Sequence, residues 1–102
     1  MAIMFIMELM YTAPIEDVEE AMDAHIAWLD EYYASGVFLA SGRKVPREGG
    51  VILARGVSRA EVEQIAAGDP FVLAGVCEYR ITEFIASKTS AGLTEVRESL
   101  PS

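Results

Sequence analysis

Histidine and cysteine each occur only once in this chain of 102 residues. A single cysteine cannot form a disulfide within the chain, and one histidine with one cysteine argues against a zinc site built by the protein. Sparse cysteine of this kind fits the reducing cytoplasm, which is the compartment that we expect for this protein.

Basic residues are also scarce. Lys and Arg number 8 against 16 Asp and Glu, so the formal net charge is −8. Nucleic-acid binding without sequence preference needs Lys and Arg to replace the counterions along the phosphates, and anionic membranes attract basic segments. The opening MAIMFIMELMY is apolar, but it is shorter than a membrane span and has no basic start. We therefore expect no nucleic-acid partner and no membrane partner.

Several familiar functional motifs are missing. The nucleotide-binding patterns G-x-G-x-x-G and G-x-x-x-x-G-K-[ST] do not occur, and neither does the nucleophile motif G-x-S-x-G or the zinc motif H-E-x-x-H. We expect neither a metal nor a bound cofactor. Any chemistry has to come from single polar residues placed beside a cleft.

Apolar residues, in contrast, are abundant. They make up 52 % of the chain, which is more than one small core hides. Residues 3–11 read as a strand with two apolar faces, one formed by Ile3, Phe5, Met7, Leu9 and Tyr11 and the other by Met4, Ile6 and Met10 with Glu8. Such a strand needs cover on both sides. We expect helices on one side and a second copy of the protein on the other.

The remaining pattern predicts a βαββαβ order. The expected elements are strands at 3–11, 37–42, 49–55 and 76–86, helices at 14–35 and 58–68, and a short helical turn opening at Asp69. Gly36 should end the first helix, and Ser58 with Glu61 forms a capping box for the second. This order gives an α+β, ferredoxin-like plait with a four-stranded antiparallel sheet. We expect one domain over 1–86 and a flexible or partner-clasping C-terminal extension over 87–102.

His25 lies on the inward stripe of the first predicted helix, with Met22 and Leu29 as neighbours. A histidine in such a stripe is usually packed in the core with one hydrogen-bond partner. It is also the one side chain of this sequence that exchanges a proton near neutral pH unaided, so it can act as a general acid or base if the stripe borders a cleft. From spacing alone both interpretations stay open.

Asp69 stands directly before Pro70 at the start of the short helical turn. A carboxylate in this position usually caps the helix by accepting a backbone N–H. It can also orient a histidine ring and stabilise its protonated form. Since the turn and the first helix belong to the same side of a plait, contact with the histidine is geometrically open.

Ser41, Gly42 and Arg43 end the second predicted strand. Gly42 would let a ligand approach the backbone, Ser41 would donate a hydrogen bond, and Arg43 would hold an anion or an enolate. The alternative is an ordinary strand end that runs into a charged loop.

Three short patterns together resemble the YciI-like, or YCII-related, family of small bacterial proteins: H-x-x-x-L in the first helix, SG at the end of the second strand, and DPFVLAGV from Asp69. The likeness spans residues 3–86. It implies a dimeric α+β barrel, in which two plaits pack sheet to sheet, and a His–Asp pair that maps onto His25 and Asp69. The family often carries an arginine shortly before the histidine. EDVEEAMDAH has none, so an anionic substrate would be bound by Arg43, by Arg80 or by no arginine.

The family includes a cofactor-free dehydrochlorinase that removes HCl from a chlorinated hydroxyhydroquinone. The resemblance therefore implies a small cofactor-independent lyase of aromatic degradation, a homodimer acting on a hydroxylated or chlorinated aromatic. His25 and Asp69 would be catalytic, and Ser41, Gly42 and Arg43 would bind the substrate. The alternatives are a non-catalytic dimeric ligand-binding or accessory module, in which Asp69 only caps, and a cofactor-free monooxygenase of the dimeric α+β barrel class.

Overall fold

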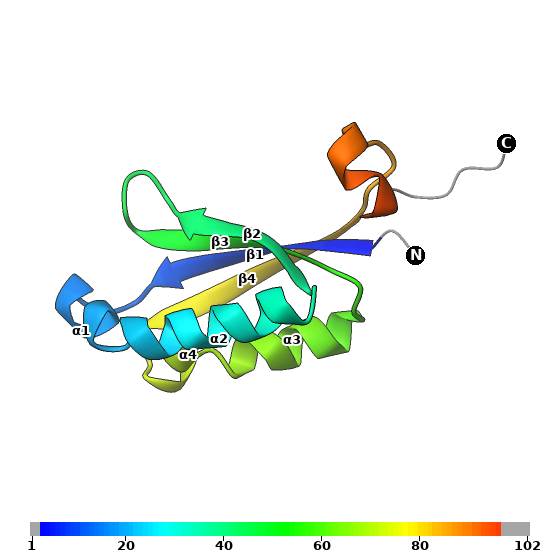
Figure 1. Ribbon diagram of the computed structural model, residues 1–102. Coiled ribbons are helices and arrows are strands. Elements are labelled where there is room, and N and C mark those ends of the chain that lie inside the picture. The colour runs from blue at the N-terminus through cyan, green and yellow to red at the C-terminus, as the bar shows by residue number, and fades with distance from the viewer. Residues whose placement is uncertain (1–2, 97–102) are drawn as a thin grey trace, which may run out of the picture.

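The computed structural model describes residues 3–96, which form one antiparallel sheet with helices on one face (Figure 1). The elements are β1 (Ile3–Tyr11), α1 (Ile15–Glu20), α2 (Met22–Ala34), β2 (Phe38–Arg43), β3 (Gly49–Arg55), α3 (Arg59–Ala67), α4 (Pro70–Leu73), β4 (Cys77–Ile85) and the 3₁₀ helix η1 (Ala91–Val96). The strand order is β2-β3-β1-β4, and every neighbouring pair is antiparallel. The expected α+β, ferredoxin-like plait is thus confirmed.

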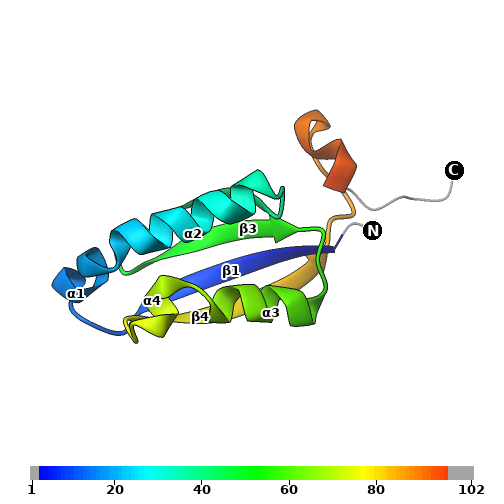
Figure 2. The same ribbon diagram turned by 60° about the horizontal axis from the view of Figure 1, so that its bottom comes forward.

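The core lies between the sheet and the α-helices. Figure 2 shows α2 and α3 running along the same face of the sheet, with α4 between them at one end. Phe5 and Met7 of β1 are completely buried beneath these helices, and Ile52 of β3 and Val62 of α3 pack into the same cluster. Burying each such side chain stabilises the fold by about 1.5–3 kcal/mol. The core therefore holds α2 and α4 against the centre of the sheet.

The other face of the sheet carries no α-helix in the described part of the chain (Figure 1). Ile6, Val51 and Phe84 keep 39 %, 39 % and 36 % of their surface exposed there. Glu8 lies on the same face and forms an ion pair with Lys44, with 2.8 Å between Oε2 and Nζ. Both faces of β1 therefore carry apolar side chains, and the face away from the helices is only partly covered within one chain.

The first helix differs from the single segment expected over 14–35. It is divided into α1 and α2 at Ala21, whose backbone (φ −95°, ψ 2°) lies outside the helical region. Glu16, Asp17, Glu19 and Glu20 follow one another at spacings at which like charges repel, and no basic residue stands in the last turn of α1. This local repulsion favours an interruption of the helix.

The end of α2 agrees with the expectation. Gly36 has φ +82°, a conformation that costs glycine little, and directly follows the C-cap Ser35. The N–H of Val37 donates to the carbonyl of Tyr32 (3.0 Å), and that of Gly36 donates to Tyr33 (3.1 Å), which is a Schellman ending. The chain is thereby turned directly into β2.

The proposed division into a domain over 1–86 and an extension over 87–102 stays a prediction. The sheet ends with β4 and is followed by η1, whereas residues 97–102 lie outside the described part of the chain. Among the described residues, no helix has the length and apolar character needed to cross a membrane.

Candidate active site

His25 of α2 and Asp69, which precedes α4, are 44 residues apart in the sequence and in direct contact in the fold. The distance between Nδ1 of His25 and Oδ1 of Asp69 is 2.8 Å. Asp69 is fully buried and His25 is 7 % exposed. The packing of α4 beneath α2 therefore creates the pair, because neither helix contains both residues.

Asp69 also caps α4. Its Oδ1 accepts the backbone N–H of Phe71 at 2.9 Å, and Pro70 begins the helix. The capping and orienting interpretations of this residue are thus compatible, since one oxygen accepts both donors. The cap holds the carboxylate rigidly to the backbone at the position where the imidazole meets it.

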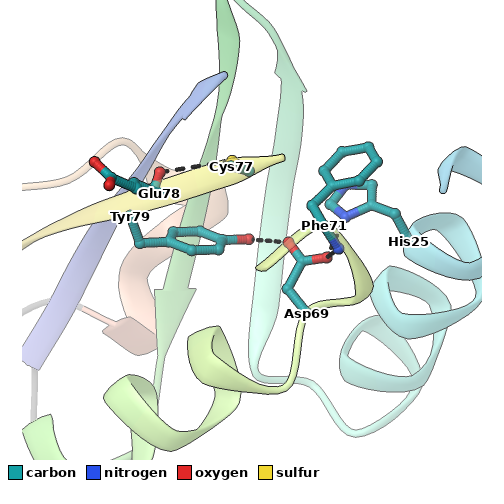
Figure 3. A network of polar contacts seen from close by, with 6 residues as sticks. All are labelled: His25, Asp69, Phe71, Cys77, Glu78 and Tyr79. Atoms are coloured by element: carbon teal, nitrogen blue, oxygen red, sulfur yellow. Dashed lines mark hydrogen bonds and ion pairs between the residues drawn. The ribbon is translucent and has the colours of Figure 1, made fainter. Parts of the chain in front are cut away.

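Tyr79 of β4 is a third donor to the same carboxylate and was not among the residues predicted from the sequence. Its hydroxyl donates to Oδ2 of Asp69 at 2.5 Å, a length typical of a charge-assisted hydrogen bond (Figure 3). Burial, and then the negative charge of Asp69, raise the pKa of the Tyr79 phenol well above its usual range. The alternation of Cys77, Tyr79 and Ile81 along β4 was the available signal, because it places the tyrosine on the helix-facing side.

Aromatic rings fix the orientation of His25. The Phe71 ring is stacked on the imidazole, with centroids 3.9 Å apart and planes 7° apart, and Trp28 lies 5.5 Å away at 29°. Because a carboxylate only accepts hydrogen bonds, Nδ1 carries the proton in the contact with Asp69. Nε2 then has a free lone pair in the neutral ring, and it makes no hydrogen bond within residues 3–96. The ring is arranged to accept a proton at Nε2.

His25 lines a pocket of about 160 Å³ between α2, α4 and the ends of β1, β2 and β3. All three predicted substrate-binding residues line it as well, namely Ser41, Gly42 and Arg43. The other lining residues are Leu9, Tyr11, Met22, Ile26, Leu29, Gly49, Gly50, Val51, Ile52 and Phe71. The walls are mostly apolar, and polar groups are concentrated at His25 and at the end of β2.

The end of β2 supplies two different polar groups. The Ser41 hydroxyl is 2.6 Å from that of Tyr33, which ties this strand end to α2. Arg43 is exposed and, within residues 3–96, forms no ion pair, so its charge is available to the pocket. Arg80, the other basic candidate, pairs with Glu8 in the sheet register and does not line the pocket. Arg43 is therefore the better placed of the two.

Glycine is required at two points of the pocket floor, Gly49 and Gly50. A Cβ at Gly49 would collide with the carbonyl of Leu9, because β3 begins directly against β1. At Gly50 a Cβ would lie 2.9 Å from the carbonyl oxygen of Gly42. At Gly42 a Cβ would meet nothing within 4 Å, so that position is spacious. The pocket floor is therefore built of backbone, as close approach of a ligand requires.

Cys77 lies beside this network but has no nucleophilic character. It is buried, and burial together with the charge of Asp69 raises the pKa of its thiol from 9.0 to about 11. The thiolate is the reactive form of cysteine, so Cys77 is inert at neutral pH. Among the described residues, no cluster of three or more His, Cys, Asp and Glu side chains could hold a metal ion.

The Cys77 thiol leads to a prediction for alkaline pH. The pKa of this thiol is higher in the folded state than in the unfolded chain, so the folded protein keeps the proton to higher pH. The free energy of unfolding is therefore unaffected by the thiol below pH 9 and falls by roughly 2 kcal/mol as the pH rises toward 11. Urea unfolding of the wild type and of Cys77→Ala at pH 8 to 11 measures this loss. We expect a steeper decline for the wild type between pH 9 and 11, and parallel curves would contradict the assignment.

Comparison with known proteins agrees with this fold. The family model of the YCII-related domain matches residues 4–85. No curated protein matches the chain. Among solved structures, 5-chloro-2-hydroxyhydroquinone dehydrochlorinase from Burkholderia phenoliruptrix AC1100, in complex with 2,5-dihydroxybenzoquinone, is similar with a TM-score of 0.71 and 17 % identity, over 81 % of this chain and 94 % of that one. The match to the family model covers most of the chain, and the protein therefore belongs to the YCII-related domain family.

Proposed function

We propose that this protein is a small lyase that uses general acid–base catalysis without a bound cofactor, and that its substrate is a single hydroxylated aromatic ring. The observation that carries the proposal is the 2.8 Å contact between His25 and Asp69 at the wall of a pocket. It leaves Nε2 of a rigidly held imidazole free to exchange protons. Family membership and the similarity to a dehydrochlorinase support the same class of reaction.

The size of the pocket supports a one-ring substrate. Its volume of about 160 Å³ is comparable with that of an engineered protein cavity of about 150 Å³, which binds benzene. The apolar walls suit the ring faces, and His25, Ser41 and Arg43 suit oxygen substituents at the ring edge.

The proposed reaction is the elimination of HCl from a chlorinated hydroxyhydroquinone. A base removes one ring hydroxyl proton, and the chlorine-bearing carbon takes up a proton, which gives a dienone. Loss of a second hydroxyl proton then supplies the electron pair that expels chloride, and a hydroxyquinone remains. Two O–H protons are lost and one is gained by carbon, so one proton and one chloride leave. No electrons are exchanged with another molecule.

Each site residue has a part in this sequence. His25 shuttles the proton through Nε2, and Asp69 orients the ring and balances the positive charge that forms on it. Arg43 stabilises the negative charge that develops on a ring oxygen, Ser41 donates a hydrogen bond to the substrate, and Gly42 lets the ring approach the backbone.

The test is to incubate the purified protein with chlorinated and chlorine-free hydroxyquinols and to measure chloride release, quinone absorbance and oxygen uptake. We expect one chloride per quinone formed from the chlorinated compounds, with no oxygen uptake. Oxygen-dependent turnover would instead identify a monooxygenase. Binding without turnover across the panel would identify a ligand-binding module and contradict the lyase proposal.

We also propose that two chains pack sheet to sheet as a homodimer. The partly exposed Ile6, Val51 and Phe84 on the helix-free face support this arrangement. Replacing Ile6 with aspartate would place a charge in the apolar interface, so sedimentation should change from twice the 11.1 kDa chain mass to the monomer. Leu73→Asp is the control, because Leu73 is 74 % exposed on α4 and lies away from this face. A wild-type protein that sediments as a monomer would refute the proposed dimer.

A further inference from the structure

Asp69 is held from opposite sides by two side chains (Figure 3). His25 bonds to Oδ1, which also accepts the N–H of Phe71, and Tyr79 bonds to Oδ2 at 2.5 Å. Every donor to this fully buried carboxylate therefore comes from a different part of the fold: α2, the start of α4, and β4. The tyrosine is the donor that occupies the oxygen not shared with the imidazole.

We propose that Tyr79 is a positioning residue for the proposed lyase reaction, on which this inference rests: its hydroxyl fixes the plane of the Asp69 carboxylate and thereby the position and the basicity of His25. A carboxylate bonded only through Oδ1 can rotate about its Cβ–Cγ bond. The bond to Oδ2 prevents that rotation. It also draws negative charge away from Oδ1, which controls how strongly Asp69 stabilises a protonated imidazole.

Tyr79 acts through Asp69 and not on the substrate. It does not line the pocket that contains His25, Ser41 and Arg43. Tyr79 instead lines a second hollow, which Val72 and Ile81 also line and which does not include His25. Burial, and then the negative charge of Asp69, raise the pKa of the Tyr79 phenol, so Tyr79 stays a donor throughout the physiological range. Its loss should therefore change kcat and leave KM unaltered.

Tyr79→Phe removes the hydroxyl and keeps the ring. We expect kcat to fall about 10-fold, as is typical when a hydrogen bond to a charged group is lost. In an Asp69→Asn background the same substitution should change kcat by less than about twofold, because the group through which Tyr79 acts is already altered. An equal loss in both backgrounds would overturn the inference.

A second measurement needs no substrate. His25 is the only histidine, so ¹⁵N-histidine labelling gives NMR signals from a single ring. We expect a protonated Nδ1 in the wild type, and a displaced Nδ1–H signal in Tyr79→Phe. Tyr32→Phe is the matched control, because Tyr32 packs against the same Trp28 and its hydroxyl has no hydrogen-bond partner within residues 3–96. An unmoved signal in Tyr79→Phe would overturn the inference.

These two measurements separate the possible failures. A displaced Nδ1–H signal in a protein that turns over no hydroxyquinol would refute the lyase but support the effect of Tyr79 on His25. If Tyr79→Phe does not fold, the hydrogen bond between Tyr79 and Asp69 is tested in the wild-type protein. Its spectrum in water must contain a slowly exchanging hydroxyl proton with a nuclear Overhauser effect to the Tyr79 ring, and the absence of that proton would refute the hydrogen bond.

Discussion

Replacing His25 with alanine is expected to lower the turnover of chlorinated hydroxyquinols by at least about 100-fold, since a positioned general acid or base contributes roughly 10²–10⁴. The reason is the geometry of the ring: Nδ1 is occupied by Asp69, and Nε2 is left for the substrate. No other side chain that lines the pocket exchanges a proton readily near neutral pH. Steady-state rates of chloride release measure the effect.

Rescue by added imidazole separates catalysis from packing. Alanine leaves a ring-sized space beside Phe71, and free imidazole that enters it should restore part of the rate if proton transfer is what was lost. A purely structural histidine would instead show lower stability and unchanged turnover per folded molecule. That result would remove the acid–base role from His25.

Replacing Asp69 with asparagine is expected to lower turnover by on the order of 100-fold or more, with a much smaller effect on folding. The asparagine carbonyl can still accept the N–H of Phe71, so the cap on α4 survives. The negative charge is lost, however, and nothing then compensates the positive charge that His25 acquires during proton transfer. Rates and urea unfolding of the same preparation measure the two effects separately.

Ser58→Ala supplies the matched control for Asp69→Asn. Ser58 is also an N-cap, since its hydroxyl accepts the N–H of Glu61 at the start of α3, but it does not line the His25 pocket. Its loss should cost about 1 kcal/mol of stability and leave turnover unchanged. If Asp69→Asn behaves in the same way, Asp69 is only a cap and the proposed pair has no catalytic role.

The sequence supported the prediction of the fold more strongly than the choice among the candidate site residues. Strand β1 was predicted over its full length, because residues 3–11 form a short run that is apolar on both faces of a strand, and Thr12 and Pro14 interrupt it. The break at Ala21 was not predicted, because alanine itself favours helix and the repulsion among the preceding acidic residues gives only a weak local signal. The sequence alone did not show whether Arg43 or Arg80 would bind an anionic substrate. The register of β4 against β1 decided between them, because it turns Arg80 toward the helix-free face of the sheet.

By itself the sequence determined the α+β class, the capping role of Asp69 and the inward orientation of His25, because alternation, periodicity and capping act within a few residues of each other. The resemblance to a family implied that Asp69 pairs with His25, but only the tertiary structure decided that the two side chains meet and that Tyr79 donates to the same carboxylate. Such contacts depend on the packing of α2, α4 and β4 around one core, and local patterns carry no information about distances between segments far apart in the chain.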